Sequence, residues 1–114
     1  MCYLSSADYV IEYYSAEVEE DILQLPDTLA ARYIVLTRRM VAVGPHLGTP
    51  HTEALGDGLF ELRLKGAEGI ARVFYGALVG RRIVMLHSFV KKTQKTPVRE
   101  LSVARARLKD VKAS

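Results

Sequence analysis

The sequence has little of what a disulfide-linked, metal-binding or membrane-spanning protein needs. It contains a single cysteine, Cys2, so no internal disulfide can form, and this fits a reducing cytoplasm. No CxxC pair and no histidine–cysteine cluster is present, which argues against a structural zinc site. The longest apolar runs, at residues 34–36 and 83–86, are far shorter than the roughly 20 residues of a membrane span. The first residues show no basic start or apolar core of a secretory signal. We therefore expect a cytoplasmic protein without membrane contact.

The charges are unevenly distributed along a chain whose composition is otherwise that of an ordinary globular domain. The 114 residues are 49% hydrophobic and 25% charged, enough for one domain with a modest core. Residues 1–54 hold eight acids and three bases, a balance of −5, whereas residues 55–114 hold five acids and thirteen bases, a balance of +8. Such a bias suggests a polyanionic partner, although an acidic helix pair beside a basic sheet would produce it too.

Hydrophobic periodicity predicts a single α+β domain over residues 1–114, in the order β-α-α-β-β-β-α. We expect a strand at 8–14, helices at 15–25 and from Asp27 or Thr28 to about Val43, a loop at 44–58, strands at 59–64, 70–79 and 82–90, and a last helix with Thr96 as cap and Pro97 in its first position. Ser15 is the expected cap of the first helix. Apolar stripes are predicted on the second helix (Leu29, Tyr33, Leu36, Met40 and Val43) and on the last helix (Val98, Leu101, Ala104, Leu108 and Val111).

The alternation of apolar and charged residues in the hairpin of residues 59–75 predicts how its two strands pair. If Lys65 pairs with Ile70, Arg63 faces Arg72, and one face of the hairpin is uniformly apolar or aromatic. That face holds Phe60, Leu62, Leu64, Ala71, Val73 and Tyr75. A slip by one residue would mix apolar and charged side chains on both faces, so the pattern favours this register.

Two arginines directly opposite each other destabilise an ordinary sheet, and an anion between them removes that cost. Phosphate matches the guanidinium fork in geometry. The alternative is that Glu61 pairs with one or both of Arg63 and Arg72 on a solvated face.

A lysine cluster follows the last strand. Lys91, Lys92 and Lys95 form either a solvated turn or, beside the arginines, one wall of a basic concavity. His87 is either structural or a group that titrates near neutral pH. His46 and His51, in a proline-containing loop with no third ligand nearby, do not predict a metal site.

The chain resembles a known family. The elements L-x-x-GLFELR at residues 55–63, RVFY at 72–75 and F-x-KKTQKTP at 89–97 are similar to those of phage-derived, HigB-like toxins of the RelE/ParE superfamily. The resemblance covers nearly the whole chain. It implies a β-α-α-β-β-β fold with an appended helix and the toxin half of a type II toxin–antitoxin pair. It further implies cleavage of mRNA on the ribosome without metal or other cofactor, by attack of a ribose 2′-OH on the adjacent phosphate.

Carried over to this sequence, the resemblance places Arg63 and Arg72 on the scissile phosphate and Lys92, Lys91 or Lys95 in proton transfer, with Lys92 as first choice. Glu61 would orient an arginine, and His87 would support the site. The remaining basic residues would bind RNA: Lys65, Arg99, Arg105 and Arg107. The implied partners are the ribosome, mRNA and a HigA-like helix-turn-helix antitoxin in a hetero-oligomer.

Two other functions stay open, because fold does not fix function. ParE-like members of the superfamily inhibit gyrase without cutting RNA. A protein that only binds RNA or a partner, such as a phage accessory protein, would also fit the sequence.

Overall fold

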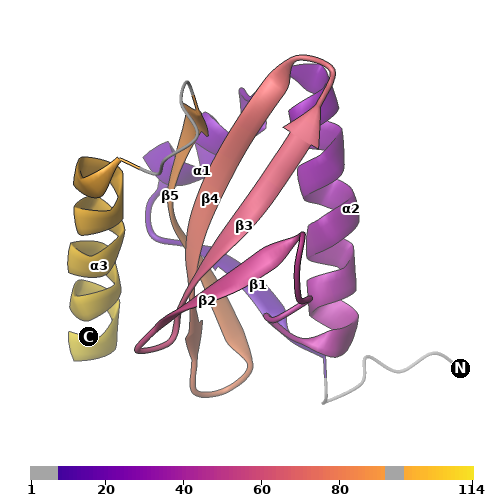
Figure 1. The fold of residues 1–114 in the computed structure, drawn as a ribbon. Coiled ribbons are helices and arrows are strands. Elements are labelled where there is room, and N and C mark those ends of the chain that lie inside the picture. Colours follow the sequence, from indigo (N-terminus) through magenta and orange to yellow (C-terminus); the bar gives the residue numbers. More distant parts are fainter. Residues whose placement is uncertain (1–7, 92–96) are drawn as a thin grey trace, which may run out of the picture.

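Three helices and five strands form the domain (Figure 1). The chain is described by a computed structural model that covers residues 8–91 and 97–114. The elements are β1 (Val10–Tyr13), α1 (Ala16–Leu23), α2 (Asp27–Val43), β2 (Thr52–Gly56), β3 (Leu59–Gly66), β4 (Gly69–Leu78), β5 (Arg82–Lys91) and α3 (Val98–Ala113). The predicted α+β class is confirmed. Within the described ranges, no helix is long and apolar enough to cross a membrane.

The sheet has the strand order β1-β5-β4-β3-β2, in which β1 runs parallel to β5 and all other neighbours are antiparallel. The prediction of one loop over residues 44–58 is therefore wrong, because Thr52–Gly56 forms β2 beside β3. This strand has only five residues, contains a register shift near Gly56 and is followed by Asp57-Gly58. Its alternation is too short to stand out against the neighbouring glycines and prolines.

The register predicted for the β3–β4 hairpin is confirmed. Lys65 pairs with Ile70, and Arg63 pairs with Arg72. The predicted apolar face lies in the first hydrophobic core, where Leu62, Leu64 and Tyr75 are fully buried. Burial of this face is the reason why the register could be predicted, since a slip would turn charged side chains into the core.

The sheet is covered on both faces. Helices α1 and α2 pack on one face, while α3 packs on the other (Figure 1). The first core joins α1 and α2, through Ile22, Leu29, Leu36 and Met40, to the predicted apolar face of the hairpin. The second core joins α3, through Ala104 and Leu108, to Leu59, Phe74, Val84 and Leu86. The sheet is thus a middle layer whose two sides have separate cores.

Helix termini agree with the predictions in part. The Ser15 hydroxyl accepts the Val18 amide at 3.2 Å, so the predicted cap of α1 is confirmed. Pro97 stands one position before the helix rather than in its first position, and Thr96 lies outside the described residues.

Both predicted apolar stripes are one residue shorter than expected. Val43, at the end of α2, is 70% exposed, and Val98, at the start of α3, is 79% exposed. Both valines lie in a terminal turn of their helix. A straight helix also drifts by about 20° per seven residues, so a stripe with this spacing turns away from the core.

A β-bulge interrupts the pairing of β4 with β5. Phe74 pairs with His87 and Tyr75 with Met85, which leaves Leu86 as the extra residue. Leu86 packs in the core under α3, and the adjacent His87 contacts Glu100 of α3. The bulge therefore presents two consecutive side chains of β5 to the same helix.

The start of α2 lies very close to the end of β3. The backbone amide and hydroxyl of Thr28 donate to the Glu68 carboxylate at 2.8 and 2.9 Å. A β-carbon added to Gly66 would lie 2.4 Å from the Thr28 hydroxyl oxygen. Only glycine permits this approach, which sets the distance between α2 and the free edge of β3.

Substitution of Gly66 by alanine is expected to reduce the free energy of unfolding by about 1–3 kcal/mol, because the added methyl group overpacks the contact with Thr28. Urea denaturation measures the change. Ala67→Gly, in the exposed turn that follows, is the control and should cost less than about 1 kcal/mol. Equal stability of Gly66→Ala and the wild type would contradict the tight contact.

Candidate functional site

Arg63 and Arg72 lie opposite each other on β3 and β4, and carboxylates balance their charges. The Glu61 carboxylate accepts from Arg63 Nε at 3.2 Å and lies 3.8 Å from Arg72 Nη1. Glu53 of β2 accepts from Arg63 Nη2 at 2.5 Å. The predicted alternative is confirmed in its pairing, since Glu61 contacts both arginines, but not in its solvated face, since Glu61 is buried. Two positive and two negative side chains form a neutral group, which we call the arginine cluster.

The members of the arginine cluster differ in exposure. The side chain of Glu61 is 7% exposed and that of Arg72 13%, whereas that of Glu53 is 46% exposed. Burial would lower the pKa of Arg63, but the hydrogen bonds that Arg63 donates to Glu61 and Glu53 outweigh this effect and raise the pKa. Burial lowers the pKa of Arg72, and the charge of Glu61 offsets this in part. Arg72 Nε is buried and has no hydrogen-bond partner among residues 8–91 and 97–114.

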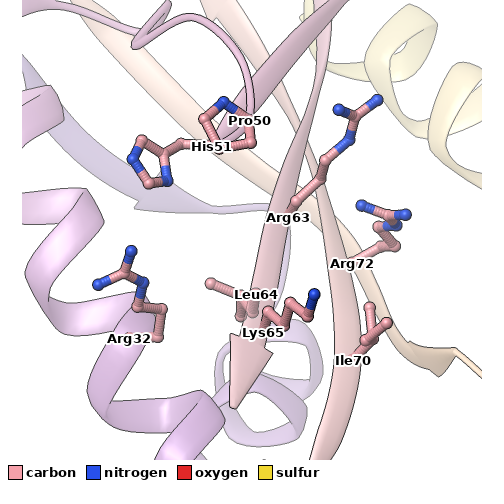
Figure 2. Close-up of a pocket in the computed structure, with 8 residues that line it drawn as sticks. All are labelled: Arg32, Pro50, His51, Arg63, Leu64, Lys65, Ile70 and Arg72. Atoms are coloured by element: carbon pink, nitrogen blue, oxygen red, sulfur yellow. The ribbon is translucent and has the colours of Figure 1, made fainter.

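A pocket of about 480 Å³ opens beside the arginine cluster (Figure 2). It is lined by Arg32, Pro50, His51, Arg63, Leu64, Lys65, Ile70 and Arg72. Four of these side chains are cationic, and none is a carboxylate. The pocket is therefore a basic concavity with an aliphatic wall, but it differs from the predicted one, because Lys91 does not line it.

The pocket exists because β2 is shorter than β3. The paired residues of the two strands end at Thr52 and Leu62, and one further hydrogen bond runs from the Arg63 amide to the His51 carbonyl at 2.8 Å. Beyond Arg63, no described strand pairs with this edge of β3. The Thr52 hydroxyl accepts the amides of Leu47 and Gly48, each at 2.9 Å, and so holds the loop that carries Pro50 and His51 at the rim.

Comparison with known proteins identifies the family. The family described as Phage derived protein Gp49-like (DUF891) matches residues 20–109. The chain belongs to this family. The matched range contains α2, all strands from β2 to β5 and most of α3, and so includes the pocket. No curated protein matches the chain.

The fold of this Gp49-like domain is similar to that of a mutant of the E. coli toxin RelE in the free state. The TM-score is 0.65, and the match covers 89% of this chain and 98% of that chain at 10% sequence identity. The predicted RelE/ParE-like fold is thereby confirmed. At this low identity, the comparison shows a common fold and does not show a common function.

The structure brings only some of the predicted site residues of the Gp49-like domain together. Lys65 lines the pocket with Arg63 and Arg72. Lys91 pairs with Ile70 on the face of Arg72, and burial, followed by the charge of Arg72, lowers the pKa of Lys91. Lys92 and Lys95 lie outside the described residues.

The basic residues of α3 do not line this pocket. Arg107 donates to the Leu86 carbonyl at 2.7 Å and lies over the Tyr14 ring, which indicates a structural role. Arg105 donates to the Leu55 carbonyl at 3.2 Å and borders a separate groove of about 300 Å³. Arg99 is exposed on the first turn of α3. RNA binding by these arginines remains a prediction.

His87 also lies away from the pocket. Its Nε2 is 2.5 Å from Glu100 Oε1, and its ring is stacked near Phe89. This contact joins β5 to the first turn of α3. Among the residues that the structure places, no three His, Cys, Asp or Glu side chains gather in a group that could hold a metal ion.

Sequence reasoning missed Arg32, Pro50 and His51 as pocket residues. Arg32 looks like any exposed arginine on an amphipathic helix, and no local pattern relates it to β3. His51 was considered only as a metal ligand. His51 lines the pocket because it directly precedes strand β2, and β2 was not predicted.

Removal of the Glu61 carboxylate should leave Arg63 and Arg72 without a common counter-ion. We expect Glu61→Gln to lower the free energy of unfolding by about 1–3 kcal/mol, because the carboxylate is nearly buried. Glu12→Gln, which breaks the exposed Glu12–Arg82 pair, should cost at most about 1 kcal/mol.

Added inorganic phosphate should raise the melting temperature of Glu61→Gln more than that of Glu12→Gln, since phosphate can replace the lost carboxylate. An equal rise in both variants would contradict the central position of Glu61.

Proposed function

We propose that this Gp49-like protein is the toxin of a type II toxin–antitoxin pair, of the HigB-like kind, and cleaves mRNA on the ribosome. The observation that supports the proposal most is the pocket, which is lined by four cationic side chains and by no carboxylate. Membership of the Gp49-like family and a fold similar to that of the toxin RelE support it.

The proposed reaction is a transesterification within the RNA. The ribose 2′-oxygen bonds to the adjacent phosphorus while the bond from phosphorus to the 5′-oxygen breaks, which leaves a 2′,3′-cyclic phosphate and a 5′-hydroxyl end. The nucleophile belongs to the substrate. The protein therefore needs to bind the phosphate, stabilise the charge that develops on it and transfer two protons.

The arginine cluster would act on the scissile phosphate by exchange of partners. A phosphate oxygen competes with the half-exposed Glu53 for Arg63, while the buried Glu61 stays in place. The unpartnered Nε of Arg72 is a further donor in the same cluster. Guanidinium groups gain most from a phosphate whose negative charge increases, as it does in the transition state.

Proton transfer would fall to a lysine of the cluster after β5. Of the three lysines, Lys91 is placed by the structure on the arginine face, and its lowered pKa makes the neutral amine more accessible as a base. Lys92 and Lys95 remain candidates. His51 is a further one, since it lines the pocket and imidazole commonly transfers protons near neutral pH.

A toxin of this kind would be held inactive by an antitoxin. We propose a HigA-like helix-turn-helix protein as this partner, in a hetero-oligomer, and the ribosome as the second partner. Contacts to RNA would be made mainly to phosphates, so binding should weaken steeply with salt.

Arg72→Ala and Arg72→Lys test the phosphate site. Loss of the forked donor should reduce mRNA cleavage by about 10²–10³-fold in both variants, because lysine keeps the charge but not the geometry. Translation reactions with ribosomes and a defined mRNA, read by primer extension, measure cleavage, and circular dichroism checks the fold. Arg38→Ala, on the outer surface of α2, should cleave normally.

Normal cleavage by a folded Arg72 variant would disprove this site. Intact mRNA together with gyrase-dependent DNA breaks in cells that express the wild type would instead identify a gyrase inhibitor.

Lys91 is tested by the pH dependence of cleavage. If its neutral amine is the base, activity rises with pH up to the lowered pKa of Lys91 and is constant above it. Lys91→Arg keeps the charge but cannot deprotonate. We expect its rate to fall by about 10²-fold and the ratio of variant to wild-type rate to decrease as pH rises.

A ratio near one at every pH would exclude Lys91 as the base. If His51→Ala instead changed the pH profile, the imidazole would take this role.

A further inference from the structure

Arg32 enters the pocket from a different layer of the fold than the arginine cluster. It lies one helical turn after Thr28, whose contacts with Gly66 and Glu68 hold α2 against the end of β3. Figure 2 shows its guanidinium on the α2 side of the pocket, toward His51, while the Lys65 side chain extends from β3 on the side of Arg72. The two cations thus stand on either side of the free edge of β3.

Arg32 and Lys65 also differ from the arginine cluster in charge balance. Arg63 and Arg72 are neutralised by Glu53 and Glu61. Neither Arg32 nor Lys65 forms an ion pair with a carboxylate in the described part of the chain. The unbalanced positive charge of the pocket therefore lies at the end of β3, where Lys65 follows Arg63 on the same face and Arg32 lies on the α2 side.

The wall between the two cationic groups is aliphatic. Leu64 and Ile70 line the pocket, with Pro50 at the rim. A volume of about 480 Å³ lies in the range of small-molecule sites. Two cationic ends with an apolar surface between them match one nucleotide of a single strand, which has a phosphate on each side of a sugar and base.

We propose that Arg32 and Lys65 form a second phosphate subsite, which binds the backbone phosphate next to the one held by Arg63 and Arg72. The ligand is a single strand of RNA, one nucleotide of which spans the pocket. This inference rests on the proposed function and identifies the part of the substrate that each cation contacts. Arg32 is a positioning residue for the strand and takes no part in bond making.

The difference in charge balance predicts that the two cationic groups act at different stages of the reaction. Binding of RNA in the ground state would depend on Arg32 and Lys65, because no ion pair with a carboxylate has to break before they contact a phosphate. The arginine cluster would contribute mainly in the transition state, after exchange with Glu53. An acidic peptide would also be attracted to Arg32 and Lys65, but it has no second, regularly spaced phosphate to offer the arginine pair. The observations therefore favour RNA.

Binding of a nucleoside 3′,5′-bisphosphate, compared with the nucleoside 3′-monophosphate, tests the second subsite by isothermal titration calorimetry. The wild type should bind the bisphosphate about tenfold more tightly, the effect of one additional charge-assisted contact. Arg32→Gln should remove this difference and leave monophosphate binding unchanged. Arg38→Gln is the matched control, six residues further along α2 and outside the pocket, and should behave as wild type.

An uncleavable 2′-O-methyl oligonucleotide gives a second readout. Loss of one phosphate contact on a single strand should reduce the slope of log K against log salt by about 0.7 in Arg32→Gln and not in Arg38→Gln. Equal effects of the two variants, equal loss of mono- and bisphosphate binding, or no binding of either nucleotide by the wild type would overturn the inference. Arg32-dependent binding of a polyglutamate peptide without binding of the bisphosphate would overturn it in favour of an acidic protein partner.

The cleavage assay with wild-type protein separates this inference from the proposed function. Cleavage of mRNA without an Arg32-dependent bisphosphate difference would disprove only the second subsite. An Arg32-dependent difference without any cleavage would disprove the nuclease function and leave an RNA-binding pocket.

Discussion

The carboxylate of Glu61 between two arginines is the interaction on which the site depends. Cross-strand pairing places Arg63 opposite Arg72, and their repulsion would weaken the hairpin without a shared counter-ion. Glu61 is nearly buried, so it is a permanent part of the cluster, whereas Glu53 is exposed enough to give way to another anion. The sheet therefore holds two guanidinium groups side by side without a bound anion, and these are the groups that we propose for binding phosphate.

The pocket is a consequence of unequal element lengths in a three-layer domain. Helices cover both faces of the sheet, but β2 stops short of the end of β3 and leaves an edge uncovered. Helix α2 runs beside this edge at a distance set by Gly66 and Thr28. Residues far apart in the chain, such as Arg32 and Arg63, thereby share one concavity, although no single element carries the site.

The parts of this arrangement that follow from local pattern could be predicted. The hairpin register follows from alternation, since a slip would bury Arg63 in the core. Strand β2 could not be predicted, because its five residues include only one that is buried, Thr52, and carry little hydrophobic alternation. Arg32 could not be assigned either, because its place in the site depends on how α2 packs and not on its neighbours in sequence. The apolar stripe predicted on α2 is confirmed as far as Met40 and wrong at Val43, which lies in the last turn of the helix and is exposed.

The bulge in β5 decides which residues of that strand lie on the face of the arginine cluster. Before it, the even-numbered Val84 faces α3; after it, the odd-numbered Phe89 and Lys91 lie on the face of Arg72. If the same sequence ran as a regular strand, with Leu86 paired to Phe74, Lys91 would lie on the face of α1 and α2, and Val90 would lie on the face of the arginines. One inserted residue thus resets the parity of the strand. A sequence alignment with a regular strand that left no gap opposite this extra residue would exchange the two faces of β5 for every residue after it.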